Sequence, residues 1–439
     1  MVAILRNTWR QAVDLYVSVE KSQSETLPAG WADTSAFVCL IIMVLALPFP
    51  DLTGVREVFF LLALIFWIVR LYRQKDYEPV RTPLDIPLLL LMAAGLFSLV
   101  TAVDRTYSLI QLVDEIFRGV LVFFLAVHHI RNSARAAVLL SAIILAALVM
   151  DSYAVSHFLF KGGDLTVMKY REAGLHRGFS DLSTYLLQTA PFLILIFLFV
   201  KKRFSKIFLG LLLALHLTAL YMTFSRAGLV FVVFEMGLVI FFWGRYLKTT
   251  LVCLVGVVLL IGLMLPHRAA TIPKTTATSG YDSSIEIPGL EDRLKMWEKA
   301  WSHIKKEPFT GIGAGRRSFS KKFPEVLKEN KLHWHSHNTL ISFTLELGVQ
   351  GLLIYLYIFY QIIRTLWIRR GRLMEDWCSS PGGVIMGGTF IMVIGFLLRN
   401  ITDHTFINDF AVFFWMFGGS AFALKIFGPR EPKIEAGDY

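Results

Sequence analysis

The sequence predicts an all-α protein that crosses a membrane about twelve times and carries one large helical loop on the outer side. Hydrophobic residues make up 55% of the 439 residues, and the mean hydropathy is +0.58. Apolar runs long enough to cross about 30 Å of hydrocarbon recur from one end of the chain to the other. These runs leave only one sizeable extramembrane piece, which is the long loop at residues 267–337.

The borders of the apolar runs set the predicted spans and their sides. The first run lies behind a charged stretch of about thirty residues, so we expect no cleavable signal peptide. The fourth run contains Asp114, Glu115 and Arg118, so an interfacial start is an alternative there. The predicted spans are about 33–50, 57–72, 84–103, 111–129, 136–159, 183–200, 205–222, 227–243, 249–266, 338–363, 382–398 and 406–427.

The distribution of lysine and arginine orients the chain. The short outer loops hold only Arg56, Arg105, Arg226 and Arg399, whereas the loops on the other side are rich in basic residues, so both ends are predicted to be cytoplasmic. Two outer segments are exceptions, a basic stretch at 160–182 and the loop at 267–337 with its thirteen Lys and Arg. Basic charge that topology does not require indicates an anionic ligand.

The chain therefore divides into three parts. Residues 1–266 hold spans one to nine with the basic segment at 160–182, residues 267–337 form the outer loop, and residues 338–439 hold the last three spans and a cytoplasmic tail. Cys39, Cys253 and Cys378 show no paired spacing, which argues against a disulfide framework and against a metal knuckle.

The outer loop contains a predicted amphipathic helix. Its apolar positions form one stripe, with two indoles suited to a membrane interface, and Glu307 and Pro308 end it. A helix that only covers the bundle is the alternative. The stripe consists of Leu290, Leu294, Trp297, Trp301 and Ile304.

A glycine-rich stretch, GIGAGRR, follows this helix. No strand precedes Gly311, Gly313 and Gly315, so a dinucleotide-binding fingerprint is excluded. The glycines can instead let the backbone approach an anionic group, with Arg316 beside it. A turn between two helices is the other interpretation.

Three motifs together resemble a known superfamily. TFSRAG at 223–228, and EDRLKMWEKAWSHIKKEPFTGIGAG followed by HSHNTLISFTLELGVQGLL at about 291–353, are similar to motifs of the bacterial O-antigen ligases and O-antigen polymerases. The resemblance implies a glycosyltransferase that takes a glycan from undecaprenyl diphosphate at the periplasmic face of the inner membrane.

The chemistry of such a donor assigns tasks to arginines. The diphosphate carrier supplies its own leaving group, so we expect no cofactor, and arginine binds phosphate oxygens in pairs. We predict that Arg226 and Arg293 bind the diphosphate, joined by Arg171 or Arg177, between which the resemblance does not choose. Arg226 could alternatively be a topological anchor, and Arg293 a solvated charge on a helix face.

The histidines before the tenth span supply a candidate base. Histidine has an unperturbed pKa near neutrality, and the resemblance places His337 at the mouth of the bundle as general base, with Asn338 orienting the imidazole or the sugar. A solvated loop histidine is one alternative. Zinc bound by His333, His335 and His337 is another, although no Cys, Asp or Glu stands near them in the sequence.

The remaining features favour metal-independent transfer. The outer loops hold scattered carboxylates and no paired acidic motif, so arginines are expected to neutralise the departing diphosphate. Arg399, Asp403 and His404, between the last two spans, are expected to extend the substrate groove.

The leading interpretation is an O-antigen ligase whose acceptor is lipid A core, working within a phospholipid bilayer without any nucleic acid. A polymerase that extends carrier-linked repeat units is the close alternative. A lipid-linked glycan transporter is a third, disfavoured because no span except the fourth carries a cluster of charges.

Overall fold

A computed structural model describes residues 30–73, 80–165, 171–176, 178–243, 290–329, 334–367 and 377–427, and these ranges contain no β-strand. A π-helix, η2 (Leu112–Phe117), precedes α6, and a short 3-10 helix, η1 (Pro50–Leu52), precedes α3. The α-helices are α2 (Gly30–Ala46), α3 (Thr53–Arg73), α4 (Asp85–Ser98), α5 (Arg105–Gln111), α6 (Arg118–His129), α7 (Ser133–Phe160), α8 (Phe179–Phe199), α9 (Arg203–Met222), α10 (Arg226–Trp243), α12 (Leu290–Lys306), α13 (Ser318–Lys322), α14 (Glu325–Glu329), α15 (Thr339–Leu366), α17 (Pro381–Thr402) and α18 (Asn408–Phe427).

The protein is a multi-pass membrane protein. Within the described ranges, seven helices are long and apolar enough to cross a membrane, namely η1 with α3, then α7, α8, α9, α15, α17 and α18, and α2 and α4 are shorter apolar helices. Eleven of the twelve predicted spans coincide with helices. The ninth, 249–266, lies outside the described residues, so the number twelve stays a prediction.

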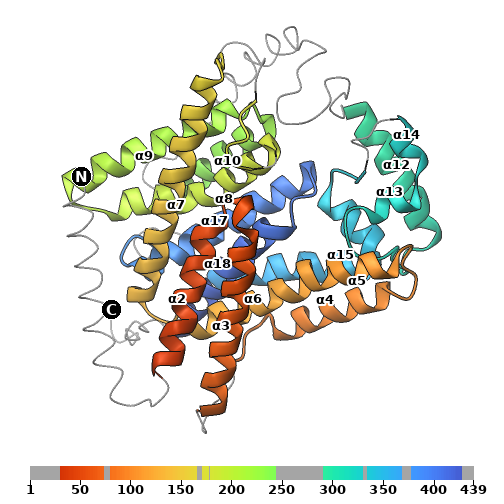
Figure 1. Cartoon of the computed structure of the whole chain (residues 1–439), viewed down its shortest axis with the longest axis horizontal. Helices are drawn as coiled ribbons and strands as arrows, with labels where there is room; N and C mark the ends of the chain where they lie inside the picture. The colour runs from red at the N-terminus through yellow and green to blue at the C-terminus, as the bar shows by residue number, and fades with distance from the viewer. Residues whose placement is uncertain are drawn as a thin grey trace, which may run out of the picture.

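Three helices form the centre of the bundle. The apolar windows of α8 and α18 are each 83% buried and that of α17 is 72% buried, whereas the values for α3 and α9 are 17% and 28%. Figure 1 shows α17 and α18 enclosed by the other helices, with α12, α13 and α14 gathered at one side beside α15. These three helices therefore form the buried core of the bundle.

The outer-loop helix α12 packs through a stripe that shares only Ile304 with the predicted one. Its buried residues are Met296, Ala300 and Ile304, at i, i+4 and i+8, and they contact α13, α14 and the start of α15. Of the predicted stripe, Leu294 and Trp301 remain 50% and 53% exposed. The helix thus buries one face against protein and leaves two large apolar side chains free for an interface.

A break in α15 receives the glycine-rich stretch. Gly348 has φ 79°, and around it the N–H groups of Ile312 and Gly313 donate to Leu345 O and Glu346 O at 2.9 and 3.2 Å. A Cβ at Gly311 would lie 1.9 Å from Glu346 O. The segment therefore lies directly on the opened backbone of α15.

Gly313 and Gly315 also face protein. They have φ of 98° and 104°, and a Cβ on them would lie 2.3 Å from Ser108 Oγ and 2.5 Å from Gln111 Cγ. The N–H of Gly315 donates to Glu346 Oε2 at 2.8 Å. These contacts give the two glycines a packing role that supports the site, and the Gly315 N–H already has a carboxylate partner.

Candidate functional site

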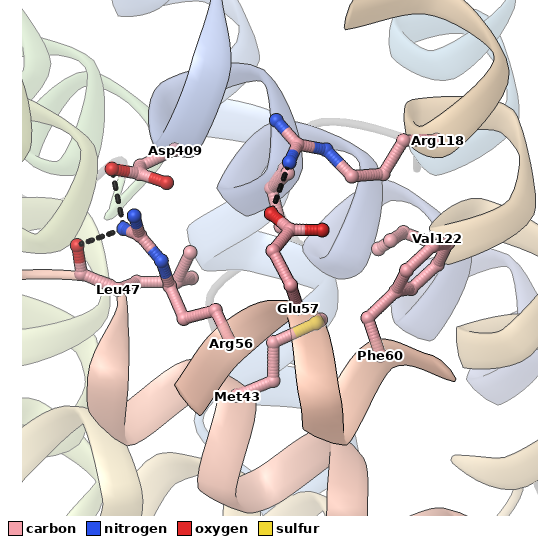
Figure 2. Close-up of a pocket in the computed structure, with 9 residues that line it drawn as sticks. Met43, Leu47, Arg56, Glu57, Phe60, Arg118, Val122 and Asp409 are labelled. Atoms are coloured by element: carbon pink, nitrogen blue, oxygen red, sulfur yellow. Dashed lines mark hydrogen bonds and ion pairs between the residues drawn. The ribbon is translucent and has the colours of Figure 1, made fainter. Parts of the chain in front are cut away.

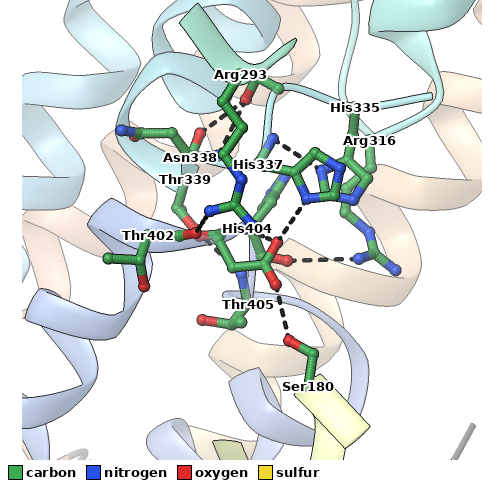
Figure 3. A network of polar contacts seen from close by, with 12 residues as sticks. Ser180, Arg293, Arg316, His335, His337, Asn338, Thr339, Thr402, His404 and Thr405 are labelled. Atoms are coloured by element: carbon green, nitrogen blue, oxygen red, sulfur yellow. Dashed lines mark hydrogen bonds and ion pairs between the residues drawn. The ribbon is translucent and has the colours of Figure 1, made fainter. Parts of the chain in front are cut away.

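Polar side chains from distant segments meet at one end of the bundle. At this end α8, α15 and α18 begin and α17 ends, and we call it the site end. Figure 3 shows the network, which joins the residues just before and after the start of α15, the turn at 402–405 between α17 and α18, and Ser180 of α8.

The centre of the network is a histidine–aspartate pair. His337 Nδ1 lies 3.2 Å from Asp403 Oδ1, and the His337 and Asp403 side chains are 13% and 16% exposed. Because an ionised carboxylate only accepts hydrogen bonds, the Nδ1 of His337 carries the proton in this contact. The other nitrogen, Nε2, is then left with a lone pair that can accept a proton from a ligand.

The surroundings keep Asp403 ionised. Burial by itself raises its pKa, but the hydrogen bond from His337 and the charge of Arg399 hold the pKa well below its usual range. Ser180 Oγ donates to Asp403 Oδ2 at 2.8 Å, and Arg399 Nη2 lies 3.5 Å from the same oxygen. Arg399 also donates to Ser180 Oγ at 2.6 Å, so it fixes both groups.

Two further imidazoles beside the pair are buried and neutral. Burial lowers the pKa of His335 and of His404 well below the ordinary value, and the charge of Arg316 lowers both further. The backbone N–H of His337 donates to His335 Nδ1 at 3.0 Å, which helps to hold the His337 backbone at its unusual φ of 51°. His335 thus supports the base sterically and through this bond.

The start of α15 is held by its own cap and by α17. Asn338 is the N-cap of α15, with its side chain accepting the Ile341 N–H at 3.1 Å. Thr339 Oγ1 donates to Asn400 Oδ1 at 2.5 Å and contacts Asp403 O at 3.1 Å. In this structure Asn338 caps the helix that follows His337, and its role in orienting the imidazole or the sugar stays a prediction.

Two arginines of the outer loop flank the aspartate. Arg293 Nη1 donates to Thr402 O at 2.6 Å, and Arg316 Nη1 donates to His404 O at 3.4 Å. Thr402 and His404 are the residues on either side of Asp403, so the loop and the bundle meet around the pair (Figure 3). The Arg316 guanidinium also lies 4.6 Å from the centre of the Trp334 ring.

Arg226 and Arg171, two more of the predicted arginines, lie near the same end of α8. Arg226 is the first residue of α10, is exposed, and has no hydrogen-bond or ion-pair partner among the described residues. Two residues further on, a Cβ at Gly228 would lie 3.1 Å from Ser183 Cβ, one turn along α8 from Ser180. Arg171 lies 3.8 Å from the ring of Phe179, the first residue of α8.

Arg171 is also bound to the backbone before Arg226. Its Nη2 donates to Phe224 O at 2.9 Å. Arg177 and His333 lie outside the described residues, so their predicted roles are not placed. Of the predicted arginines, the structure brings Arg293 and Arg316 to the pair itself and brings Arg171 and Arg226 to the neighbouring helix end.

Two histidines and a carboxylate lie close enough together to bind one metal ion. Donor atoms of His335, His337 and Asp403 lie within 4.8 Å of one another, so the sequence-based reason against zinc, the lack of a nearby carboxylate, is wrong. Two features oppose a dication here. His335 Nδ1 already accepts a backbone N–H, and the positive charges of Arg399 and Arg316 act on the same groups.

A separate polar pocket has its arginines paired with carboxylates of its own lining. It lies between α2, α3, α6 and α18, where Arg56 pairs with Asp409 and Arg118 pairs with Glu57 (Figure 2). Arg56 also donates to Leu47 O at 3.3 Å. Because both arginines already have carboxylate partners, this pocket offers less to an anion than the site end.

Charged groups also pair inside the bundle. Asp151 of α7 and His216 of α9 are fully buried, and His216 Nδ1 lies 2.8 Å from Asp151 Oδ2. Glu235 of α10 is fully buried as well. Each of these spans contributes a single ionisable group, and packing brings the groups of α7 and α9 together across spans.

Residues 209–356 match the protein family described as "O-Antigen ligase". About a third of this chain is therefore similar to that family. The matched region runs from α9 into α15 and includes His337, Arg226 and Arg293, whereas Asp403, Ser180 and Arg399 lie outside it. The likeness confirms the superfamily resemblance of the sequence motifs.

Parts of this chain are also similar to proteins of Rickettsia. A protein of Rickettsia felis, provisionally named a polysaccharide ligase, is 28% identical over 162 residues, covering 35% of this chain and 39% of the relative. A similarly named protein of Rickettsia prowazekii is 27% identical over 252 residues, covering 56% and 58%. The chain thus spans between about two fifths and three fifths of the length of these curated relatives.

Sequence reasoning named Asp403 and Arg399 only as groove residues and omitted Ser180. The charged turn RNITDHTF between two apolar runs was the available signal for Asp403 and Arg399. Ser180 carried no signal, because a serine near the start of a span is common on capping grounds alone. Its contact with Asp403 depends on how α8 packs against α17.

Proposed function

We propose that the protein is a glycosyltransferase that moves O-antigen glycan from undecaprenyl diphosphate to a sugar of lipid A core, at the periplasmic face of the bacterial inner membrane. One observation carries the proposal. The contact between His337 Nδ1 and Asp403 Oδ1 leaves Nε2 as an oriented base at the site end, which is rich in arginine.

The reaction follows from these groups. An acceptor hydroxyl loses its proton to His337 Nε2 while its oxygen forms a bond to the anomeric carbon of the donor sugar. The bond from that carbon to the diphosphate oxygen breaks, and the diphosphate leaves with the electron pair. Asp403 stabilises the imidazolium that results, and it holds the ring in place throughout.

Arginines offset the charge of the leaving diphosphate. Arg226 has no partner among the described residues and begins a helix, and α8 begins near it without a side-chain cap. Arg293 uses one N–H on Thr402 O and keeps others for a ligand. Arg171 and Arg177 remain candidates for the same task. With this cationic set, we propose transfer without a metal ion.

The ligase and the polymerase differ only in the acceptor. The names of the Rickettsia relatives refer to a polysaccharide ligase, which supports the ligase. The basic outer loop also fits a phosphorylated core oligosaccharide as acceptor. Basic residues on the opposite loops support a site that faces the periplasm.

Transfer assays with purified protein test the proposal. Carrier-linked glycan is incubated with core lipid in one reaction and with a second carrier-linked unit in another. A ligase adds glycan to the core lipid only, a polymerase lengthens the carrier-linked glycan only, and a transporter leaves both unchanged. If the core lipid in the first reaction is recovered without added glycan, the proposal is contradicted.

A further inference from the structure

A fully buried glutamate anchors the segment that leads into α8. Glu172 has 0% exposure, and His157 Nδ1 of α7 lies 3.2 Å from each of its carboxylate oxygens. The N–H of Gly174 donates to Glu172 Oε1 at 2.6 Å. The His157 ring is itself stacked on Tyr153, with ring centres 5.4 Å apart and planes 13° apart. The carboxylate is thus fixed from α7 and from its own loop.

The anchored segment holds the turn between α9 and α10 at two points. The backbone N–H of Glu172 donates to Met222 O at 3.0 Å, and Arg171 Nη2 donates to Phe224 O at 2.9 Å. Phe158 of α7 packs against Met222 and Phe224 from the side. The carbonyls on both sides of Thr223 are therefore bound by neighbouring residues of one segment.

The turn needs this support. Phe224 has φ 50°, a left-handed conformation that costs a residue with a side chain about 1–3 kcal/mol and persists only where the surroundings impose it. Arg226 begins α10 two residues later and has no partner of its own among the described residues. The position of its Cα atom and the direction of its Cα–Cβ bond are consequently set by the backbone of this turn.

We propose that Glu172, clamped by His157, is a positioning residue that acts through Arg226 on the binding of the donor diphosphate. The inference rests on the proposed function, because it takes the diphosphate as the ligand of Arg226. It adds that residues 171–174 and the TFSRAG turn form one unit, with an acidic residue at its centre. A glutamate in a diphosphate site is otherwise unfavourable, since its charge repels the ligand.

A thermodynamic cycle on ligand binding tests this role. Undecaprenyl diphosphate binding is measured on the full chain in nanodiscs for wild type, Glu172→Gln, Arg226→Ala and the double variant. Glu172→Gln keeps the size of the side chain and one acceptor oxygen. We expect it to weaken binding roughly tenfold in the wild-type background and less than about twofold in the Arg226→Ala background, because the residues act as one unit.

Matched variants separate positioning from general stability. His157→Ala should reproduce the Glu172→Gln loss, and His157→Asn, whose amide can still donate to the carboxylate, should recover part of it. Glu325→Gln removes an exposed glutamate that pairs with Lys299 on the outer loop, and it should bind like wild type. Thermal unfolding of each variant identifies any loss that comes from misfolding.

The outcomes distinguish the two proposals. Wild-type binding by Glu172→Gln together with weak binding by Arg226→Ala overturns the positioning role alone. Equal losses from Glu172→Gln in both backgrounds also overturn it, because the glutamate then acts independently of Arg226. Wild-type binding by Arg226→Ala overturns the diphosphate assignment and the inference with it.

Discussion

His337 and Asp403 stand 66 positions apart in the chain, yet His337 Nδ1 lies 3.2 Å from Asp403 Oδ1. The contact fixes which nitrogen of His337 holds the proton, and Arg399 and Ser180 fix the aspartate in turn. A histidine in a solvated loop would have neither constraint. The relationship therefore makes His337 an oriented base, with Asp403 as the group that orients it.

Removal of the base should slow the chemical step. We expect His337→Ala to lower kcat by about 10²- to 10⁴-fold while donor binding stays close to wild type. Transfer and donor binding are measured on the same preparation. Near-normal turnover of a well-folded His337→Ala protein would remove His337 from the reaction.

Asp403→Asn should be nearly as damaging as loss of the base. An asparagine can present an amide N–H to His337 Nδ1, which would favour the tautomer with its proton on Nε2 and so block proton acceptance. We expect a fall in kcat of about 10²-fold or more. Arg226 contacts neither group in the structure, so donor binding by Asp403→Asn serves as the internal control. An unchanged kcat would show that the aspartate is dispensable.

The sequence predicted the helices and singled out His337, but it did not predict that His337 contacts Asp403. Long apolar runs define spans almost independently of their neighbours, and His337 directly precedes one. The pairing with Asp403 depends on how α15 packs against α17, and no local pattern specifies that packing. The same holds for the glycines. The sequence indicates that another group comes close to the backbone at Gly315, and in the structure that group is the Glu346 carboxylate.

Charge and geometry separate at Arg226. Arg226→Lys keeps the positive charge but loses the planar fork that binds two phosphate oxygens, so donor affinity should fall about tenfold or more. Direct binding on membranes with matched protein levels measures the effect. A topological anchor would tolerate lysine, so wild-type affinity and turnover of Arg226→Lys would identify Arg226 as an anchor.

Chelation tests the absence of a metal from the reaction. Because arginines surround the pair, we expect transfer to continue undiminished after EDTA treatment of protein prepared without a polyhistidine tag. The donor atoms of His335, His337 and Asp403 are nonetheless close enough for an ion. Activity that disappears in EDTA and returns with a single divalent metal would make this cluster a catalytic metal site.

Gly311→Ala should loosen the outer loop from the bundle. The added Cβ would lie 1.9 Å from Glu346 O, a backbone atom that cannot move without shifting α15. We expect a loss of about 1–3 kcal/mol in the free energy of unfolding, seen as a lower thermal midpoint. Gly54→Ala is the matched control, because a Cβ there has nothing within 4 Å. Equal midpoints for the two variants would contradict the close contact.

Acidification should destabilise the site end through its buried imidazoles. Burial, and then the charge of Arg316, hold the pKa of His404 well below its ordinary value of 6.5 in the folded protein. Below about pH 6.5 the unfolded chain therefore binds a proton that the folded chain does not, so stability falls as the pH falls. The same sign holds for His335.

The measurement compares thermal midpoints at pH 7.5 and pH 5.5, a range in which ordinary carboxylates stay ionised. Wild type should unfold at a lower temperature at pH 5.5, and His404→Gln should show a smaller drop because it has lost one of the protons taken up on unfolding. His333→Gln, at a position predicted to be solvated, should keep the wild-type drop. If His404→Gln and His333→Gln lose stability equally on acidification, His404 titrates alike in both states and is not held neutral by the fold.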